Sequence, residues 1–117
     1  MEINKEVLKG HIDTLILSLL HNRDMYGYDL AKTVRDKSEN TFELKEGTLY
    51  LSLKRLEQNK WVDSYWGEEH GPGGRRKYYK LTSLGDEELN RKRSEWQFVK
   101  KIMDSFLEGS ERPNETN

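Results

Sequence analysis

The 117-residue chain has no cysteine and only two prolines. The absence of thiols excludes disulfides and thiolate zinc sites, and it suits a reducing compartment. No segment approaches the 18 consecutive apolar residues that a transmembrane helix needs, and residues 1–5 lack a signal-peptide pattern. These absences predict a soluble cytoplasmic protein, and the length of 117 residues fits one domain.

Apolar residues and an excess of positive charge are also scarce. Only 33% of the residues are apolar while 35% are charged, so the core must be thin, and pairing with a second copy would add apolar burial. The formal net charge is −1, which means that any nucleic-acid surface must come from uneven charge placement. Such a region exists at residues 70–80, which carry Arg75, Arg76, Lys77 and Lys80 without an acidic residue.

The periodicity of the apolar residues predicts an α+β fold that is mainly helical. The chain reads as a winged helix-turn-helix, with a DNA-binding domain over 1–82, a dimerisation helix over 83–108 and a flexible tail over 109–117. Ser83–Asp86 resembles a capping box that would open the last helix. The expected helices cover 5–21, 26–37, 46–59 and 83–108, and the expected strands cover 61–66 and 75–81, joined by the glycine-rich segment 67–74.

The helix expected at 46–59 and the basic hairpin after it form the candidate DNA-binding unit. Leu49, Leu53 and Leu56 share one face. If they are buried, the residues left to face outward or sideways are Thr48, Tyr50, Ser52, Lys54 and Arg55. The hairpin adds Arg75, Arg76 and Lys77, which would neutralise phosphates or enter a minor groove. Either basic segment alone is more simply a solvated surface, but the two in this order favour DNA binding.

The chain also resembles the PadR family of bacterial winged-helix transcriptional regulators, in particular its short subfamily. The resemblance implies a homodimeric repressor whose third helix and wing contact a double-stranded DNA operator. Two positions depart from the family pattern: Leu51 stands where many members have proline, and Lys60 where a glycine is usual. The matching motifs are Gly27-Tyr28-Asp29-Leu30, Gly47-Thr48-Leu49-Tyr50, Arg55-Leu56-Glu57, Ser64-Tyr65-Trp66, Gly73–Thr82 and Gly85.

The last expected helix carries apolar residues at spacings of 7, 3, 4 and 3, which is a heptad-like pattern. These residues are Leu89, Trp96, Val99, Met103 and Phe106. A single helix of this length cannot bury such a face against so small a domain, so we expect contact with the first helix of a partner subunit. The alternative is packing onto its own domain.

Trp96 is the candidate ligand-binding residue. From the residues alone, a tryptophan that serves only the interface is the simpler interpretation. The resemblance changes this, because a multidrug-binding repressor of the short subfamily pairs tryptophans at this place to sandwich planar compounds. That relative has an acidic residue where this chain has Lys100, whereas Asp13 would still supply negative charge. We therefore expect a planar aromatic ligand, neutral or flavin-like, near Trp96, Asp13 and Lys100.

Nothing in the sequence favours an enzyme. His11, His21 and His70 do not have the spacing of metal ligands, and Gly71–Gly74 lacks the Lys-Ser/Thr of a phosphate-binding loop. We expect no catalytic residues, cofactor or metal. Two other functions stay open: a winged-helix protein-interaction module that has lost DNA binding, and a small-molecule carrier built around Trp96.

Overall fold

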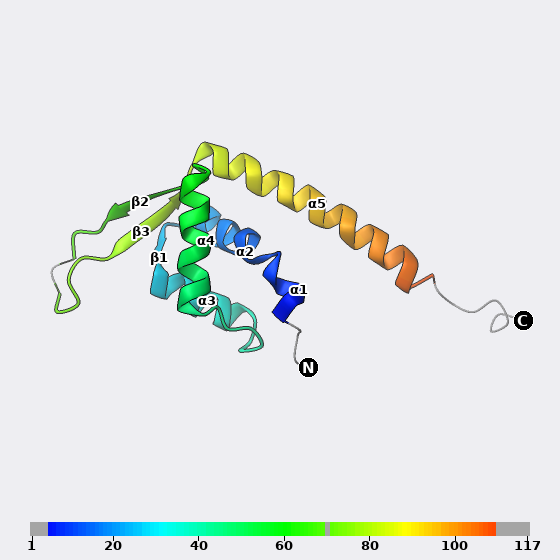
Figure 1. The fold of residues 1–117 in the computed structure, drawn as a ribbon, viewed down its shortest axis with the longest axis horizontal. Helices are drawn as coiled ribbons and strands as arrows, with labels where there is room; N and C mark the ends of the chain where they lie inside the picture. Colours follow the sequence, from blue (N-terminus) through cyan, green and yellow to red (C-terminus); the bar gives the residue numbers. More distant parts are fainter. Residues whose placement is uncertain (1–4, 70, 110–117) are drawn as a thin grey trace, which may run out of the picture.

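The computed structural model describes residues 5–69 and 71–109, as a small helical body from which a hairpin and a long helix project in different directions (Figure 1). The order of helices and strands confirms the expected mainly helical winged helix-turn-helix. The elements are α1 (Lys5–Lys9), α2 (Ile12–Asn22), β1 (Met25–Tyr26), α3 (Gly27–Lys37), α4 (Glu46–Gln58), β2 (Val62–Trp66), β3 (Lys77–Leu81) and α5 (Ser83–Leu107).

The sheet has the strand order β1-β3-β2, and both pairings are antiparallel. Tyr79 in the central strand lies opposite Met25 on one side and Ser64 on the other. The sequence predicted β2 and β3 but not β1. Two residues are too few to show the alternation that identifies a strand.

The first helix differs from the prediction of one helix over 5–21. It is interrupted at Gly10 and His11, which form a turn closed by the His11 N–H bond to the Leu8 carbonyl at 2.8 Å. Glycine is a poor helix former because it loses much backbone entropy on ordering. The break lets α1 take a direction of its own.

The core lies where α2, α3, α4 and the sheet meet, and the start of α5 closes it. Leu89 of α5 is fully buried in this core (0% exposed). Its assignment to a dimer interface is therefore wrong, because the domain of its own chain already covers its side chain. No helix of the described residues is long and apolar enough to cross a membrane.

The N-terminal cap of α5 is Thr82, one residue before the predicted capping box. The Thr82 hydroxyl accepts the Gly85 N–H at 3.0 Å and donates to the Lys60 carbonyl at 2.7 Å. Because one hydroxyl serves both the end of α4 and the start of α5, the cap fixes the junction from which α5 departs.

The end of α4 has the left-handed C-cap that the sequence left uncertain. Lys60 has φ 62°, its N–H bonds the Glu57 carbonyl, and the Trp61 N–H bonds the Leu56 carbonyl. This is a Schellman motif with lysine at the position that favours glycine.

A Lys60→Gly substitution is expected to stabilise the protein by about 0.5–1 kcal/mol. Glycine avoids the side-chain clash of the left-handed region, and this gain exceeds its greater entropy loss on folding. Urea denaturation would measure the change. Lys54→Gly, in the exposed middle of the same helix, should instead destabilise by about 1 kcal/mol.

Candidate nucleic-acid interface

Helix α4 presents one exposed face and one buried face, as the sequence predicted. Leu49, Leu53 and Leu56 are at most 2% exposed. The exposed residues recur at helical spacing and include Gly47, Thr48, Tyr50, Leu51, Lys54 and Gln58. The helix thus offers small, hydroxyl, apolar and cationic groups to one side, and Leu51 is an exposed apolar residue that the sequence reading did not include among the contacts.

Tyr50 packs on the start of α3. A side chain added at Gly27 would collide with the Tyr50 ring and hydroxyl, which shows how closely the tyrosine lies over the backbone there. Tyr50 nevertheless stays 45% exposed. It therefore braces α4 against α3 while keeping part of its ring on the exposed face.

Arg55 does not extend freely from α4. Its Nε and one terminal nitrogen bond both Asp13 carboxylate oxygens, at 2.9 and 2.6 Å, and that terminal nitrogen also bonds the Ser52 hydroxyl at 3.0 Å. As a hydrogen-bond acceptor, Asp13 raises the pKa of Arg55. Such a bidentate pair fixes both groups, so Arg55 ties α4 to α2 in this structure.

Two expectations for the residues around this ion pair are wrong. Ser52 was expected to face outward or sideways, but it is buried. Asp13 was expected to supply charge beside Trp96, but it is turned to Arg55 and is absent from the lining of the cleft at Trp96. Ser52 is buried because it shares the inner face of α4 with Leu49 and Leu56, whereas Asp13 is turned away by a partner 42 residues later in the sequence.

The basic residues of the wing, which is the hairpin formed by β2, β3 and the connecting segment, are held in place by local contacts. Arg75 Nε donates to the Gly67 carbonyl at 2.8 Å. The Arg76 guanidinium lies 4.8 Å from the centre of the Tyr26 ring, and Lys77 Nζ lies 5.7 Å from that of Tyr79. Arg75 and Arg76 are exposed and Lys77 is half-buried. Three positive charges are thus displayed on an ordered support.

A row of tyrosines crosses the sheet beneath Arg76, and sequence reasoning missed it. Tyr26, Tyr78 and Tyr65 lie opposite one another on β1, β3 and β2, with ring centres 5.5 and 5.6 Å apart. The Tyr65 hydroxyl donates to Asp24 at 2.5 Å, which raises the pKa of Tyr65 to about 12. The row stiffens the wing, and only the strand pairing, with β1 included, reveals it.

Comparisons with known proteins identify the family of this chain. The profile of the PadR-like family of transcriptional regulators matches residues 16–91, which span α3, α4 and the wing. The chain belongs to the PadR-like family of transcriptional regulators. It is therefore a DNA-binding regulator of transcription.

Related proteins match over most of their length. A PadR family transcription regulator from Clostridium difficile is 50% identical, with a TM-score of 0.74 over 83% of this chain and 98% of that chain. A transcriptional regulator from Clostridium thermocellum is 41% identical, with a TM-score of 0.80 over 87% and 98% of the two chains. An uncharacterized protein from Lysinibacillus sphaericus is 39% identical, and the match covers 93% of this chain and 99% of that protein.

In this PadR-like regulator, Trp96 lines a cleft of about 350 Å³ between α5 and the α1–α2 turn. The Trp96 ring meets His11 edge-to-face, with centres 5.5 Å apart and planes at 80°. Lys92 and Glu95 also line the cleft, and each is in an ion pair, with Glu88 and Arg91 respectively. The charges around the cleft are therefore balanced, and Lys100 is not part of its lining.

The histidines of this PadR-like regulator lie apart. His11 contacts Trp96, His21 Nδ1 lies 3.2 Å from Asp86 near the start of α5, and His70 is outside the described residues. Within residues 5–69 and 71–109, no group of three His, Asp or Glu side chains is placed to hold a metal ion.

Proposed function

We propose that this regulator binds a pseudo-palindromic operator as a homodimer and represses transcription. The observation that carries the proposal is the presence on one chain of two unpartnered surfaces: the exposed face of α4 beside the wing, and an apolar face on the outer part of α5. Figure 1 shows the wing and the outer part of α5 on opposite sides of α4. One surface suits DNA and the other suits a second copy.

In this proposal, α4 enters the major groove. Thr48, Tyr50 and Leu51 near its start would meet base edges, with Leu51 suited to a thymine methyl group, while Lys54 would reach a phosphate. Arg55 acts indirectly, by holding α4 against α2 through Asp13. The wing residues Arg75, Arg76 and Lys77 would bind the flanking backbone.

Replacing Arg75, Arg76 and Lys77 together by alanine is the test of the wing. Each lost phosphate contact should reduce the salt slope of DNA binding by about 1, so the triple variant should lose about 3 for each protomer. The measurement is a salt series of gel shifts or anisotropy titrations on the DNA upstream of the protein's own gene.

The matched control keeps the charges: Arg75→Lys, Arg76→Lys and Lys77→Arg in one chain. This variant should retain the salt slope, because the slope counts charges rather than shapes. An alanine variant whose affinity and salt slope equal those of the natural chain would refute the wing assignment, and a chain with no salt-dependent affinity would favour the protein-interaction module instead.

Homodimerisation would use the outer part of α5. Trp96, Val99, Met103 and Phe106 lie on one side of the helix and are between 40% and 72% exposed in the single chain. Apolar side chains at heptad-like spacing gain free energy when a second helix covers them. Effector binding between the subunits would then change the distance between the two α4 helices, and so their fit to half-sites about one DNA turn apart.

We propose that the effector is a neutral planar aromatic compound that lies against Trp96. The balanced charges of the cleft give a cation or an anion no preference, whereas an indole face favours a flat ring. Riboflavin, a neutral planar tricyclic compound, should quench tryptophan fluorescence on binding, and Trp96→Ala should weaken its binding by about tenfold or more.

Trp66→Ala is the matched control for this titration, since Trp66 is an exposed tryptophan on the wing. It should leave the riboflavin affinity unchanged. Equal affinities in Trp96→Ala and the natural chain would exclude the sandwich. Ligand binding that never alters DNA affinity would indicate the small-molecule carrier.

A further inference from the structure

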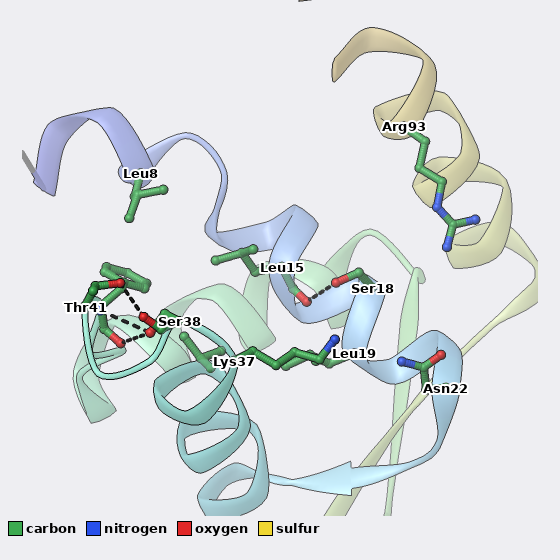
Figure 2. Close-up of a pocket in the computed structure, with 11 residues that line it drawn as sticks. Leu8, Leu15, Ser18, Leu19, Asn22, Lys37, Ser38, Thr41 and Arg93 are labelled. Carbon is green, nitrogen blue, oxygen red and sulfur yellow. Dashed lines mark hydrogen bonds between the residues drawn. The ribbon is translucent and has the colours of Figure 1, made fainter. Parts of the chain in front are cut away.

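A second cleft, of about 500 Å³, lies between α1, α2, the end of α3 and the side of α5 (Figure 2). It shares Leu8 and Leu15 with the cleft at Trp96 but not Trp96 itself. The DNA-binding function does not use it. Its volume falls within the range of small-molecule sites.

The lining of this cleft is mostly apolar and also carries two cations. Leu8, Leu15, Leu19, Val34 and Phe42 supply the apolar part. Figure 2 shows the Lys37 side chain running along the cleft beside Leu19 with its ammonium group towards Asn22, and the Arg93 guanidinium extending from α5. The cleft therefore combines an apolar lining with two positive charges.

The two cations have no acidic partner among the residues that the structure describes. Arg93 bonds only the neutral amide oxygen of Asn90, at 3.2 Å, and Lys37 forms no ion pair there. Their neighbours on the same helices differ, because Lys32 pairs with Asp36 at 3.0 Å and Arg91 pairs with Glu88 at 2.8 Å. Lys37 and Arg93 thus bring two positive charges without an acidic partner to the lining of the cleft.

Lys37 is also not needed to cap α3. The Val34 and Arg35 carbonyls accept the N–H groups of Ser38 and Asn40, and the Ser38 hydroxyl bonds the Arg35 and Phe42 carbonyls. The end of the helix is closed by its own backbone and one serine. The Lys37 ammonium can therefore bind another group.

We propose that this cleft binds a small amphipathic anion, whose carboxylate or sulfonate lies between Lys37 and Arg93 and whose apolar body lies against Leu8, Leu15 and Phe42. A carboxylate satisfies both cations with charge-assisted hydrogen bonds, while the apolar body displaces water from the leucines. The two cations without an acidic partner favour this occupant over a second copy's apolar α5 face. The proposal is independent of the operator and of the effector at Trp96.

The test is a fluorescence titration of the full chain with 8-anilinonaphthalene-1-sulfonate, an aromatic sulfonate that brightens in apolar surroundings, with decanoate as competitor. The natural chain should bind the dye and release it to decanoate. The double variant Lys37→Gln/Arg93→Gln should bind it about tenfold or more weakly, the loss expected for charge-assisted contacts.

The control Lys32→Gln/Arg91→Gln removes two charges from the same helices outside the cleft and should leave the affinity unchanged, as should Trp96→Ala. Equal affinities in the Lys37/Arg93 variant and the natural chain would overturn the proposal. So would loss of binding in Trp96→Ala alone, which would put the dye in the other cleft. Dye binding that falls as protein concentration rises would mean that a second copy covers the site, and would overturn it too.

Discussion

Replacing Gly85 by alanine is expected to destabilise the protein by about 3 kcal/mol, the upper part of the range for overpacked sites. A side-chain carbon at this position would lie 1.9 Å from the Trp61 carbonyl oxygen, a backbone atom that cannot rotate away. The same carbonyl accepts the Thr82 N–H at 3.1 Å. The added methyl group therefore displaces α5 and breaks the contacts that join it to the end of α4.

Thermal unfolding measures this effect, and the melting temperature should fall by on the order of 15 °C. Gly47→Ala is the matched control, because nothing lies within 4 Å of the added carbon on the exposed face of α4. It should be neutral or stabilising by about 0.5 kcal/mol. If the Gly85→Ala chain melts within a few degrees of the natural one, α5 can move away from the Trp61 carbonyl without a measurable loss of stability, and the prediction is wrong.

Gly85 also shows which features of this junction could be predicted from the sequence. The family motif included the residue, and the helix that contains it begins at Ser83 as expected. The reason for glycine was not visible, since it depends on the Trp61 carbonyl, which is brought to α5 by the turn after α4. Local patterns predicted where α5 starts, whereas its contact with the rest of the chain required the fold.

The ion pair of Asp13 and Arg55, at the candidate DNA-binding surface, is a second contact that local sequence patterns could not predict. The spacing of Leu49, Leu53 and Leu56 correctly predicted which side of α4 is buried. The same spacing placed Arg55 near the boundary between the buried and exposed faces of α4, where a cation can bind either DNA or an acidic residue of another helix. Only the crossing of α2 over α4 decides this, and residues 42 positions apart give no local sign of it.

Introducing an acidic residue on the apolar face of α5, as in Met103→Asp, is expected to convert the proposed dimer into monomers. Symmetry would bury two new carboxylates in each dimer, at roughly 3 kcal/mol apiece. The dissociation constant should therefore rise on the order of 10⁴-fold. Sedimentation velocity at micromolar concentration would detect the change in mass, and DNA affinity should fall because a single chain holds one half-site.

Ser105→Asp provides the matched control for Met103→Asp. At 100° per residue, Ser105 lies on the side of α5 away from Trp96, Val99 and Met103, so its carboxylate stays in water and the dimer should persist. Beyond Leu89, α5 has no buried residue in the single chain. A helical segment of this length is marginal in water without packing, so the Met103→Asp monomer should also lose helical circular dichroism. Identical masses for the two variants would place the contact between subunits elsewhere, and a Met103→Asp monomer with unchanged helicity would mean that α5 is stable without a partner.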